Sequence, residues 1–350
     1  TVRKNLRKQA MTERVNIFDP HFLRGSKELQ HFLLSLLKGG LDKQARDAVG
    51  RAAAAYVNGS IGPHIGQFSQ EAPDKITHTL DQRGYAVIEP IFSDQQIKKI
   101  TDFLSDKPVL YGHTGQLENG KQGEVQLKDL PEGTRFAHYK PENVLQCTEI
   151  FEAIHNKALI TTAGHYLRAP PTISSVALWW SYPSNQEPGG MQSFHHDRGD
   201  FRSCNLFVYL TDVSEETGPH AFVAGTHDFD LLYADVMERF GGYSERFSEF
   251  WQWMQVHRKT DDDVLKYFED EIKVYTGPKG TSFLEDTRGL HKATIPTKGP
   301  RLAFEIVYTT LPKFNEPVLL ASRLGAGNVR IGNGNAQDPL VKYATRAIYR

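Results

Sequence analysis

The sequence contains little cysteine, no long apolar run and no secretory signal. Cys147 and Cys204 are the only cysteines among 350 residues, and they do not form a C-x-x-C pair. A disulfide scaffold is therefore not expected, and a reducing compartment is favoured. No segment provides the about 20 apolar residues of a membrane-spanning helix, and the basic, polar N-terminus lacks the apolar stretch of a signal peptide. We expect a cytoplasmic protein without a membrane partner.

Charge and missing motifs narrow the function further. The 41 basic and 42 acidic residues leave a formal net charge of -1, so no overall field attracts nucleic acid. Neither a G-x-S-x-G nucleophile elbow nor a phosphate-binding Gly-Lys-Ser/Thr loop is present. With 39% hydrophobic and 24% charged residues, the composition is that of an ordinary globular protein. The expected partner is a small-molecule substrate.

The first 75 residues predict a helical N-terminal extension. Residues 26–56 are expected to be helical, because apolar side chains recur there at helical spacing until a Gly39-Gly40 pair ends the run. A new structural unit is expected to begin near residues 81–88, where a turn leads into a short strand. The catalytic core is therefore placed at residues 76–310.

After Pro170-Pro171 the sequence of the expected core is rich in β-forming residues. Short runs of β-branched and aromatic residues alternate there with turn residues, which favours a double-stranded β-helix, or jelly roll. Residues 311–350 are rich in glycine and asparagine over much of their length and predict a loop-like C-terminal tail. The expected strands cover residues 173–182, 205–210, 221–223, 281–284 and 302–309.

Residues 228–274 return to a helical pattern and predict an insertion within the barrel sequence. An aromatic stripe runs from Tyr243 to Met254, for which core packing is the favoured interpretation. The position of the insertion also suggests a lid over the site, with Trp251 and Trp253 contacting the substrate. A homodimer interface is the alternative use of the same stripe.

The residues with the clearest chemistry are His195, Asp197 and His291. On an extended segment, alternate side chains share a face, so His195 and Asp197 can converge on one metal while His196 points away. His196 is the rival ligand. His291 follows the expected strand at 281–284 and is the leading third ligand. Two histidines and one carboxylate leave coordination positions open, as in iron(II) oxygenases.

Arg301 lies ten residues after His291, at the start of the next expected strand. A guanidinium binds a carboxylate through two parallel hydrogen bonds, so this position suits the far carboxylate of 2-oxoglutarate. A strand-edge salt bridge with Glu305 is the alternative interpretation.

Taken together, these motifs resemble the phytanoyl-CoA dioxygenase-like family of iron(II)/2-oxoglutarate oxygenases over roughly residues 76–310. The resemblance includes the Asp-Gln-Arg-Gly-Tyr sequence from Asp81, the His-x-Asp, the phrase from Glu216 to His227, the distal His291 and the trailing Arg301. It implies a jelly-roll core with Fe(II), 2-oxoglutarate as co-substrate and O2. It also implies release of succinate and carbon dioxide as the substrate is oxidised, with hydroxylation as the leading reaction.

Two further residues are candidates for holding the co-substrate. Family members often place a small hydroxyl residue two positions after the distal histidine, whereas this chain has Ala293 there and Thr294 one position further on. Thr294 is therefore taken as the candidate. Asn205, on the strand after Asp197, could hydrogen-bond the co-substrate, and capping of a turn is its alternative role.

Three rival functions stay open at this point. An iron halogenase is disfavoured, because it would need the carboxylate ligand removed and Asp197 is present. A second possible function is that of a jelly-roll protein that binds metal without catalysis. A third is that of a cupin-like isomerase that consumes no oxygen. The fold alone does not choose the substrate.

Overall fold

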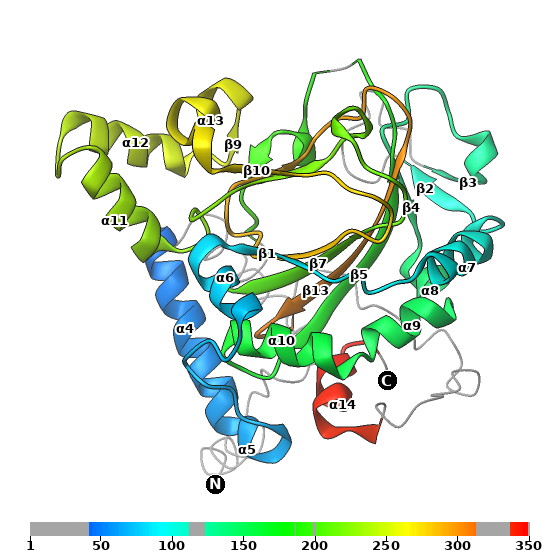
Figure 1. Ribbon diagram of the computed structural model, residues 1–350, viewed down its shortest axis with the longest axis horizontal. Coiled ribbons are helices and arrows are strands. Elements are labelled where there is room, and N and C mark those ends of the chain that lie inside the picture. The colour runs from blue at the N-terminus through cyan, green and yellow to red at the C-terminus, as the bar shows by residue number, and fades with distance from the viewer. Residues whose placement is uncertain (1–41, 112–122, 186, 199–200, 313–336, 349–350) are drawn as a thin grey trace, which may run out of the picture.

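The computed structural model describes residues 42–111, 123–185, 187–198, 201–312 and 337–348. Two antiparallel sheets face each other at its centre, and helices cover the outside of the larger one (Figure 1). In the larger sheet the strand order is β1-β11-β7-β13-β5-β4-β2-β3, and in the smaller sheet it is β10-β8-β12-β6-β9. None of the helices within the described ranges combines the length and the apolar character needed to traverse a bilayer.

The strands and helices have the following bounds. The larger sheet contains β1 (Tyr85–Ile88), β2 (Val109–Tyr111), β3 (Gly123–Val125), β4 (Phe136–Tyr139), β5 (Thr172–Ser181), β7 (Ser203–Tyr209), β11 (Ser282–Glu285) and β13 (Arg301–Thr309). The smaller sheet contains β6 (Phe194–His195), β8 (His220–Val223), β9 (Arg258–Lys259), β10 (Ile272–Tyr275) and β12 (His291–Ala293). The helices are α4 (Lys43–Ser60), α5 (Gly62–Ile65), α6 (Lys75–Arg83), α7 (Asp94–Leu104), α8 (Pro141–Val144), α9 (Thr148–Ile154), α10 (Lys157–Leu167), α11 (Phe229–Arg239), α12 (Glu245–Gln255), α13 (Asp261–Phe268) and α14 (Pro339–Thr345).

The central strand β7 is buried on both faces, which explains the uninterrupted apolar run at residues 206–209. Leu206 and Val208 pack into the cluster under the helices, whereas Phe207 and Tyr209 pack into the cluster between the two sheets. Alternate residues of β7 thus pack into two different hydrophobic clusters, because successive side chains on a strand point to opposite faces. The predicted jelly roll is confirmed.

The insertion is helical over most of its length, with α11, α12 and α13 forming a layer beside the smaller sheet (Figure 1). Its aromatic side chains pack mainly against one another, with Phe250 and Phe268 fully buried. Core packing is therefore their main role, as the sequence favoured. Tyr243 is the exception, since it precedes α12 and is 80% exposed.

Three stretches differ from the sequence-based expectation or extend it. Residues 81–83, expected in a turn, are the last turn of α6, which ends at Gly84 with a left-handed φ of 81°. The expected loop-like tail contains α14, whose Val341 and Ala344 are buried against the core. The loop-like tail was predicted from the stretch rich in glycine and asparagine at residues 323–337, of which all but Gln337 lie outside the described residues. Of the helix expected at 26–56, the part up to residue 41 also lies outside them, and the remainder belongs to α4.

Candidate metal centre

His195 and His291 face each other across two short neighbouring strands. β6 pairs with β12 in the antiparallel register that sets His195 opposite His291, and their ring centroids are 4.3 Å apart. Residues paired in this way present their side chains on the same face of the sheet. Strand pairing therefore brings together two histidines that are 96 positions apart in the sequence.

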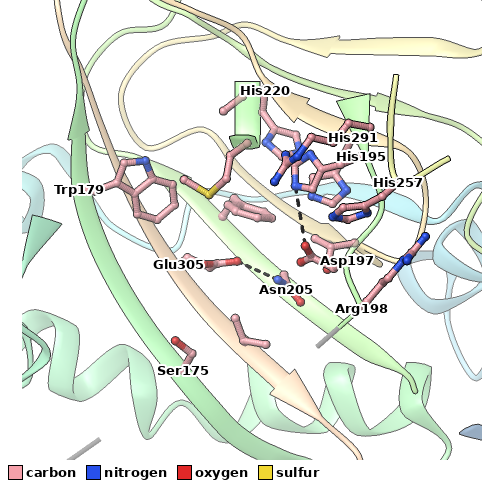
Figure 2. A pocket seen from close by; sticks show the side chains of 16 residues that line it. Ser175, Trp179, His195, Asp197, Arg198, Asn205, His220, His257, His291 and Glu305 are labelled. Carbon is pink, nitrogen blue, oxygen red and sulfur yellow. Dashed lines mark hydrogen bonds and ion pairs between the residues drawn. The ribbon is translucent and has the colours of Figure 1, made fainter. Parts of the chain in front are cut away.

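Asp197 joins them from the residues that follow β6. Its backbone N–H donates to the carbonyl of Thr287 at 2.7 Å, and its Oδ1 lies 3.8 Å from His195 Nε2. One ligand atom from each of His195, Asp197 and His291 lies within 4.8 Å of the others, and Figure 2 shows the three side chains converging at one end of a pocket. His196 lies outside this group, and its Nε2 accepts a hydrogen bond from Arg198 Nε at 3.1 Å.

Both histidine rings are oriented by backbone carbonyls. Nδ1 of His195 lies 2.9 Å from the Ser193 carbonyl, and Nδ1 of His291 lies 3.0 Å from that of Gly289. A carbonyl can only accept, so Nδ1 carries the proton and the lone pair of Nε2 is left for a metal. Burial, reinforced by the neighbouring His291, lowers the pKa of His195 to about 3, which keeps its ring neutral. A neutral imidazole is the form that ligates.

The three residues line a pocket of about 670 Å³ between the sheets. This volume suits a co-substrate together with a small organic molecule, since ligand pockets typically measure about 300–1,000 Å³. Trp179, Met191 and Phe207 contribute apolar walls, and Asn205 and Glu305 contribute polar groups opposite the metal ligands.

Asn205, a candidate co-substrate residue from the sequence, lines this pocket. Its Nδ2 donates to Glu305 Oε1 at 2.8 Å, and its buried Oδ1 has no hydrogen-bond partner among the described residues. Glu305 is thus bound to Asn205, and no ion pair joins it to Arg301 in the part of the chain that the structure describes. The strand-edge salt bridge considered for Arg301 is not observed.

Arg301 is buried at the first position of β13 and is not one of the residues that line this pocket. Its Nη1 donates to the Gly218 carbonyl and its Nη2 to Ser181 Oγ at 3.3 Å, while the buried Nε has no hydrogen-bond partner among the residues that the structure describes. Within the described residues no carboxylate neutralises this guanidinium. A buried cation without a counter-charge is costly, so the site is suited to an anionic ligand.

The structure corrects the expectation for Thr294. On β12 the side chains alternate, so His291 and Ala293 line the metal pocket, whereas Lys292 and Thr294 line a separate hollow on the other face. The Thr294 N–H donates to the Pro219 carbonyl at 3.0 Å. Thr294 is therefore not positioned to contact a ligand at the metal, and the side chain that faces the pocket is Ala293.

His220 and Glu285 form a buried pair beside the candidate metal ligands and had no role in the sequence-based prediction. Their side chains are 2.9 Å apart, and the His220 ring stacks on His291 with centroids 5.6 Å apart. Burial raises the pKa of Glu285 to about 8 and lowers that of His220 to about 3, so the contact is a neutral hydrogen bond. The overlooked signal was a charged residue directly after the strand expected at 281–284, two residues after Phe283 and therefore on the same inward face.

The insertion reaches the pocket through His257 and Arg258 and not through its tryptophans. β9 pairs with β6 and sets Arg258 opposite His195. The insertion thus adds an edge strand to the smaller sheet, next to the strand that carries His195. Trp251 and Trp253 instead pack within the insertion's own core.

Comparison with known proteins agrees with this geometry. A family model described as phytanoyl-CoA dioxygenase (PhyH) matches residues 80–301, which is well over half of the chain. The chain belongs to the phytanoyl-CoA dioxygenase family, as its motifs predicted. None of the curated proteins matches it by sequence.

Several solved structures resemble this one at low identity. Iron-bound EctD from S. alaskensis is 17% identical with a TM-score of 0.45, and the match covers 71% of this chain and 82% of EctD. HygX from Streptomyces hygroscopicus, with nickel and 2-oxoglutarate bound, is 16% identical with a TM-score of 0.41, over 70% of this chain and 89% of HygX. The epimerase SnoN, in complex with Fe3+, alpha ketoglutarate and nogalamycin RO, is 14% identical with a TM-score of 0.44, over 67% and 82%.

The buried histidines predict how stability depends on pH. Burial lowers the pKa of His227 to about 4, and its Nε2 contacts the Asp81 carbonyl at 3.1 Å. Between about pH 6.5 and pH 4 the unfolded chain binds a proton at His227 that the folded chain does not, so stability falls as the pH falls. From about pH 7 to pH 5 we expect this residue to account for roughly 2 kcal/mol of lost unfolding free energy.

Urea unfolding of the metal-free protein measures this effect. His227→Gln should lose less stability on acidification than the wild type, whereas His78→Gln at an exposed position should follow the wild type. Equal pH dependence of wild type and His227→Gln would contradict the assignment.

Proposed function

We propose that this protein is an iron(II)- and 2-oxoglutarate-dependent oxygenase acting on a small organic molecule. The observation that carries the proposal is the convergence of His195, Asp197 and His291 within 4.8 Å at a pocket of a phytanoyl-CoA dioxygenase family member. Two imidazoles and a carboxylate are the donor set of non-haem iron(II) oxygenases, and they leave positions for a chelating co-substrate and O2. The donor set therefore fits the metal that the family uses.

His195, Asp197 and His291 would hold the iron, and Arg301 would bind the distal carboxylate of 2-oxoglutarate. When bound, iron and 2-oxoglutarate together supply the oxidising chemistry, with O2 as oxidant and succinate and carbon dioxide as products. The protein orients the two imidazoles through the carbonyls of Ser193 and Gly289. Trp179, Met191 and Phe207 supply apolar walls on part of the pocket, where a bound substrate would displace water.

Hydroxylation of a C–H bond is the leading reaction within this class. The carboxylate of Asp197 is present, which disfavours a halogenase, because a halide would need that coordination position. Asn205 also lines the pocket, but its Nδ2 already donates to Glu305, and its Oδ1, which has no partner among the described residues, can only accept. It could bind the co-substrate only if Nδ2 were released from Glu305, whereas the free Oδ1 suits a donor group of the prime substrate. Consumption of O2 with formation of succinate would distinguish this function from a cupin-like isomerase or a non-catalytic metal-binding jelly roll.

The ligand assignment is tested with matched histidine variants. His291→Ala should weaken Ni(II) binding by more than the roughly 10- to 100-fold that loss of an outer-sphere partner costs, because a direct ligand is lost. His196→Ala should keep near-normal affinity, since His196 lies outside the cluster. Isothermal titration calorimetry measures both. Normal metal content and 2-oxoglutarate turnover in His291→Ala would refute the assignment.

The role of Arg301 is tested through 2-oxoglutarate affinity. Removing one partner of a buried charge pair costs roughly 2–5 kcal/mol, which corresponds to an approximately 30- to 3,000-fold weaker affinity. We expect at least the lower value for Arg301→Leu in the Ni(II)-loaded protein, and a smaller loss for Arg301→Lys, which keeps the charge but not the paired donors. An unchanged dissociation constant in Arg301→Leu would make Arg301 a structural residue.

The insertion is proposed to select the prime substrate through Arg258 and His257. Arg258→Ala removes a side chain that lines the pocket while leaving all three metal ligands and Arg301 in place. Substrate-stimulated succinate formation should fall, whereas Ni(II) affinity and slow substrate-independent decay of 2-oxoglutarate should stay within about twofold. Tyr243→Ala, at an exposed position of the same insertion, is the control. Dissociation of an oligomer in Arg258→Ala with unchanged substrate kinetics would favour the dimer-interface alternative.

A further inference from the structure

Helix α4 lies outside the matched family region, yet it contacts the segments that carry the candidate metal ligands. Its contact face consists of residues at positions 43, 46, 47 and 50, spaced i, i+3, i+4 and i+7, which is one stripe of a helix. Arg46 and Asp47 are 7% and 3% exposed. This stripe is polar where an ordinary packing face would be apolar. Figure 1 shows α4 running beside the start of α11.

The first contact is made by Arg46, whose Nη2 donates to the backbone carbonyl of Asp197 at 3.1 Å. The N–H of Asp197 is held from the opposite side by the Thr287 carbonyl at 2.7 Å. Both backbone polar groups of Asp197 are thus engaged, one by α4 and one by the turn before His291. Asp197 follows a strand of only two residues, so its position depends on such external contacts.

The second contact is made by Asp47, which binds that same turn. Asp47 Oδ1 forms a buried ion pair with Arg288 Nη1 at 2.6 Å, and Arg288 also binds Asp286 Oδ2 at 2.6 Å. Asp286 in turn accepts a hydrogen bond from the Tyr166 hydroxyl. Arg288 lies three residues before His291, so α4 is connected to both ligand-bearing segments.

The third contact joins α4 to the base of the insertion. Asp47 Oδ2 accepts from the N–H of Phe229, the first residue of α11, at 2.8 Å, and Lys43 Nζ donates to the His227 carbonyl. Gly50 packs so closely that an added Cβ would lie 2.9 Å from the Phe201 carbonyl oxygen. One face of α4 therefore contacts the segment after Asp197, the turn before His291 and the start of the insertion.

Attachment of a helix does not by itself require these charges. Well-packed apolar side chains often replace a buried ion pair without loss of stability, whereas ion pairs and hydrogen bonds impose a fixed geometry. Further along the same face, Ala54 and Val57 already provide apolar attachment against Ala169. The polar stripe is concentrated where α4 meets the ligand-bearing segments.

We propose that Arg46 and Asp47 of α4 are positioning residues that set the metal centre by fixing the backbone of Asp197 and the turn before His291. The inference rests on the proposed function, since it takes Asp197 and His291 as metal ligands. Outer-sphere contacts of this kind orient the direct ligands, and their loss typically costs about 10- to 100-fold in metal affinity.

The test compares Arg46→Met and Asp47→Asn with Arg51→Met. Arg51 lies on the same helix and forms an exposed ion pair with Asp230 of α11 at 3.5 Å, so its loss removes a charge contact between the same elements without touching the ligand-bearing segments. Ni(II) binding is measured by calorimetry with and without 2-oxoglutarate, and the Co(II) d–d spectrum reports the coordination geometry. Thermal unfolding of each metal-free variant reports its stability.

We expect Arg46→Met and Asp47→Asn to bind Ni(II) about 10-fold or more weakly and to alter the Co(II) spectrum. Arg46→Lys should bind Ni(II) more tightly than Arg46→Met, because it keeps a donor at that position. Arg51→Met should have wild-type Ni(II) affinity. Wild-type affinity and spectrum in Arg46→Met and Asp47→Asn, with only a lower unfolding temperature, would overturn the positioning role while leaving the proposed function intact. Absence of Ni(II) binding by the wild type itself would overturn both.

Discussion

The antiparallel pairing that sets His195 opposite His291 is the constraint on which the site depends. β6 and β12 are only two and three residues long, yet their register brings two imidazoles to a centroid distance of 4.3 Å. A shift by one residue would send these rings to the opposite face of the sheet, because the side-chain period of a strand is two. The hydrogen bond from the Asp197 N–H to the Thr287 carbonyl links the third candidate ligand to the turn before His291.

Short strands need support from their surroundings, and here it comes from several directions. On the far side of β12, β8 pairs with His291 and carries His220 against its ring. On the far side of β6, β9 of the insertion pairs with His195. The buried charges around Arg288 connect the turn before His291 to α4 and, through Asp286, to Tyr166 of α10. The segments around the candidate metal centre thus include α10, β8 and β9 within the matched family region and α4 outside it.

Much of this arrangement could be predicted from the sequence because it follows local rules. The alternation of a strand predicted that His195 and Asp197 would share a face and that His196 would not, and the structure brings together the same three residues. Thr294 was misjudged for the same physical reason, because nearness to His291 in sequence was given more weight than the alternation that turns residue 294 away. Arg301 was proposed because it lies ten residues after His291 at the start of an expected strand, and its burial without a carboxylate partner among the described residues could be seen only in the structure.

The remaining features depend on long-range contacts that no single segment encodes. Nothing within α4 indicates that Arg46 would meet residue 197 or that Asp47 would meet residue 288, across separations of 151 and 241 positions. The pairing of His220 with Glu285 likewise arises only when β8 and β11 lie on facing sheets. The end of the tail forms α14 because it has a core surface to cover, which composition alone does not reveal.

The central claim is that one metal ion is held by His195, Asp197 and His291. Crystals grown anaerobically with Fe(II) and 2-oxoglutarate, measured on both sides of the iron absorption edge, test this claim most directly. We expect one strong anomalous peak at bonding distance from all three side chains, with 2-oxoglutarate chelating the iron and directed toward Arg301. An iron peak at other residues, or a metal bound at these three with no 2-oxoglutarate beside it, would contradict this assignment.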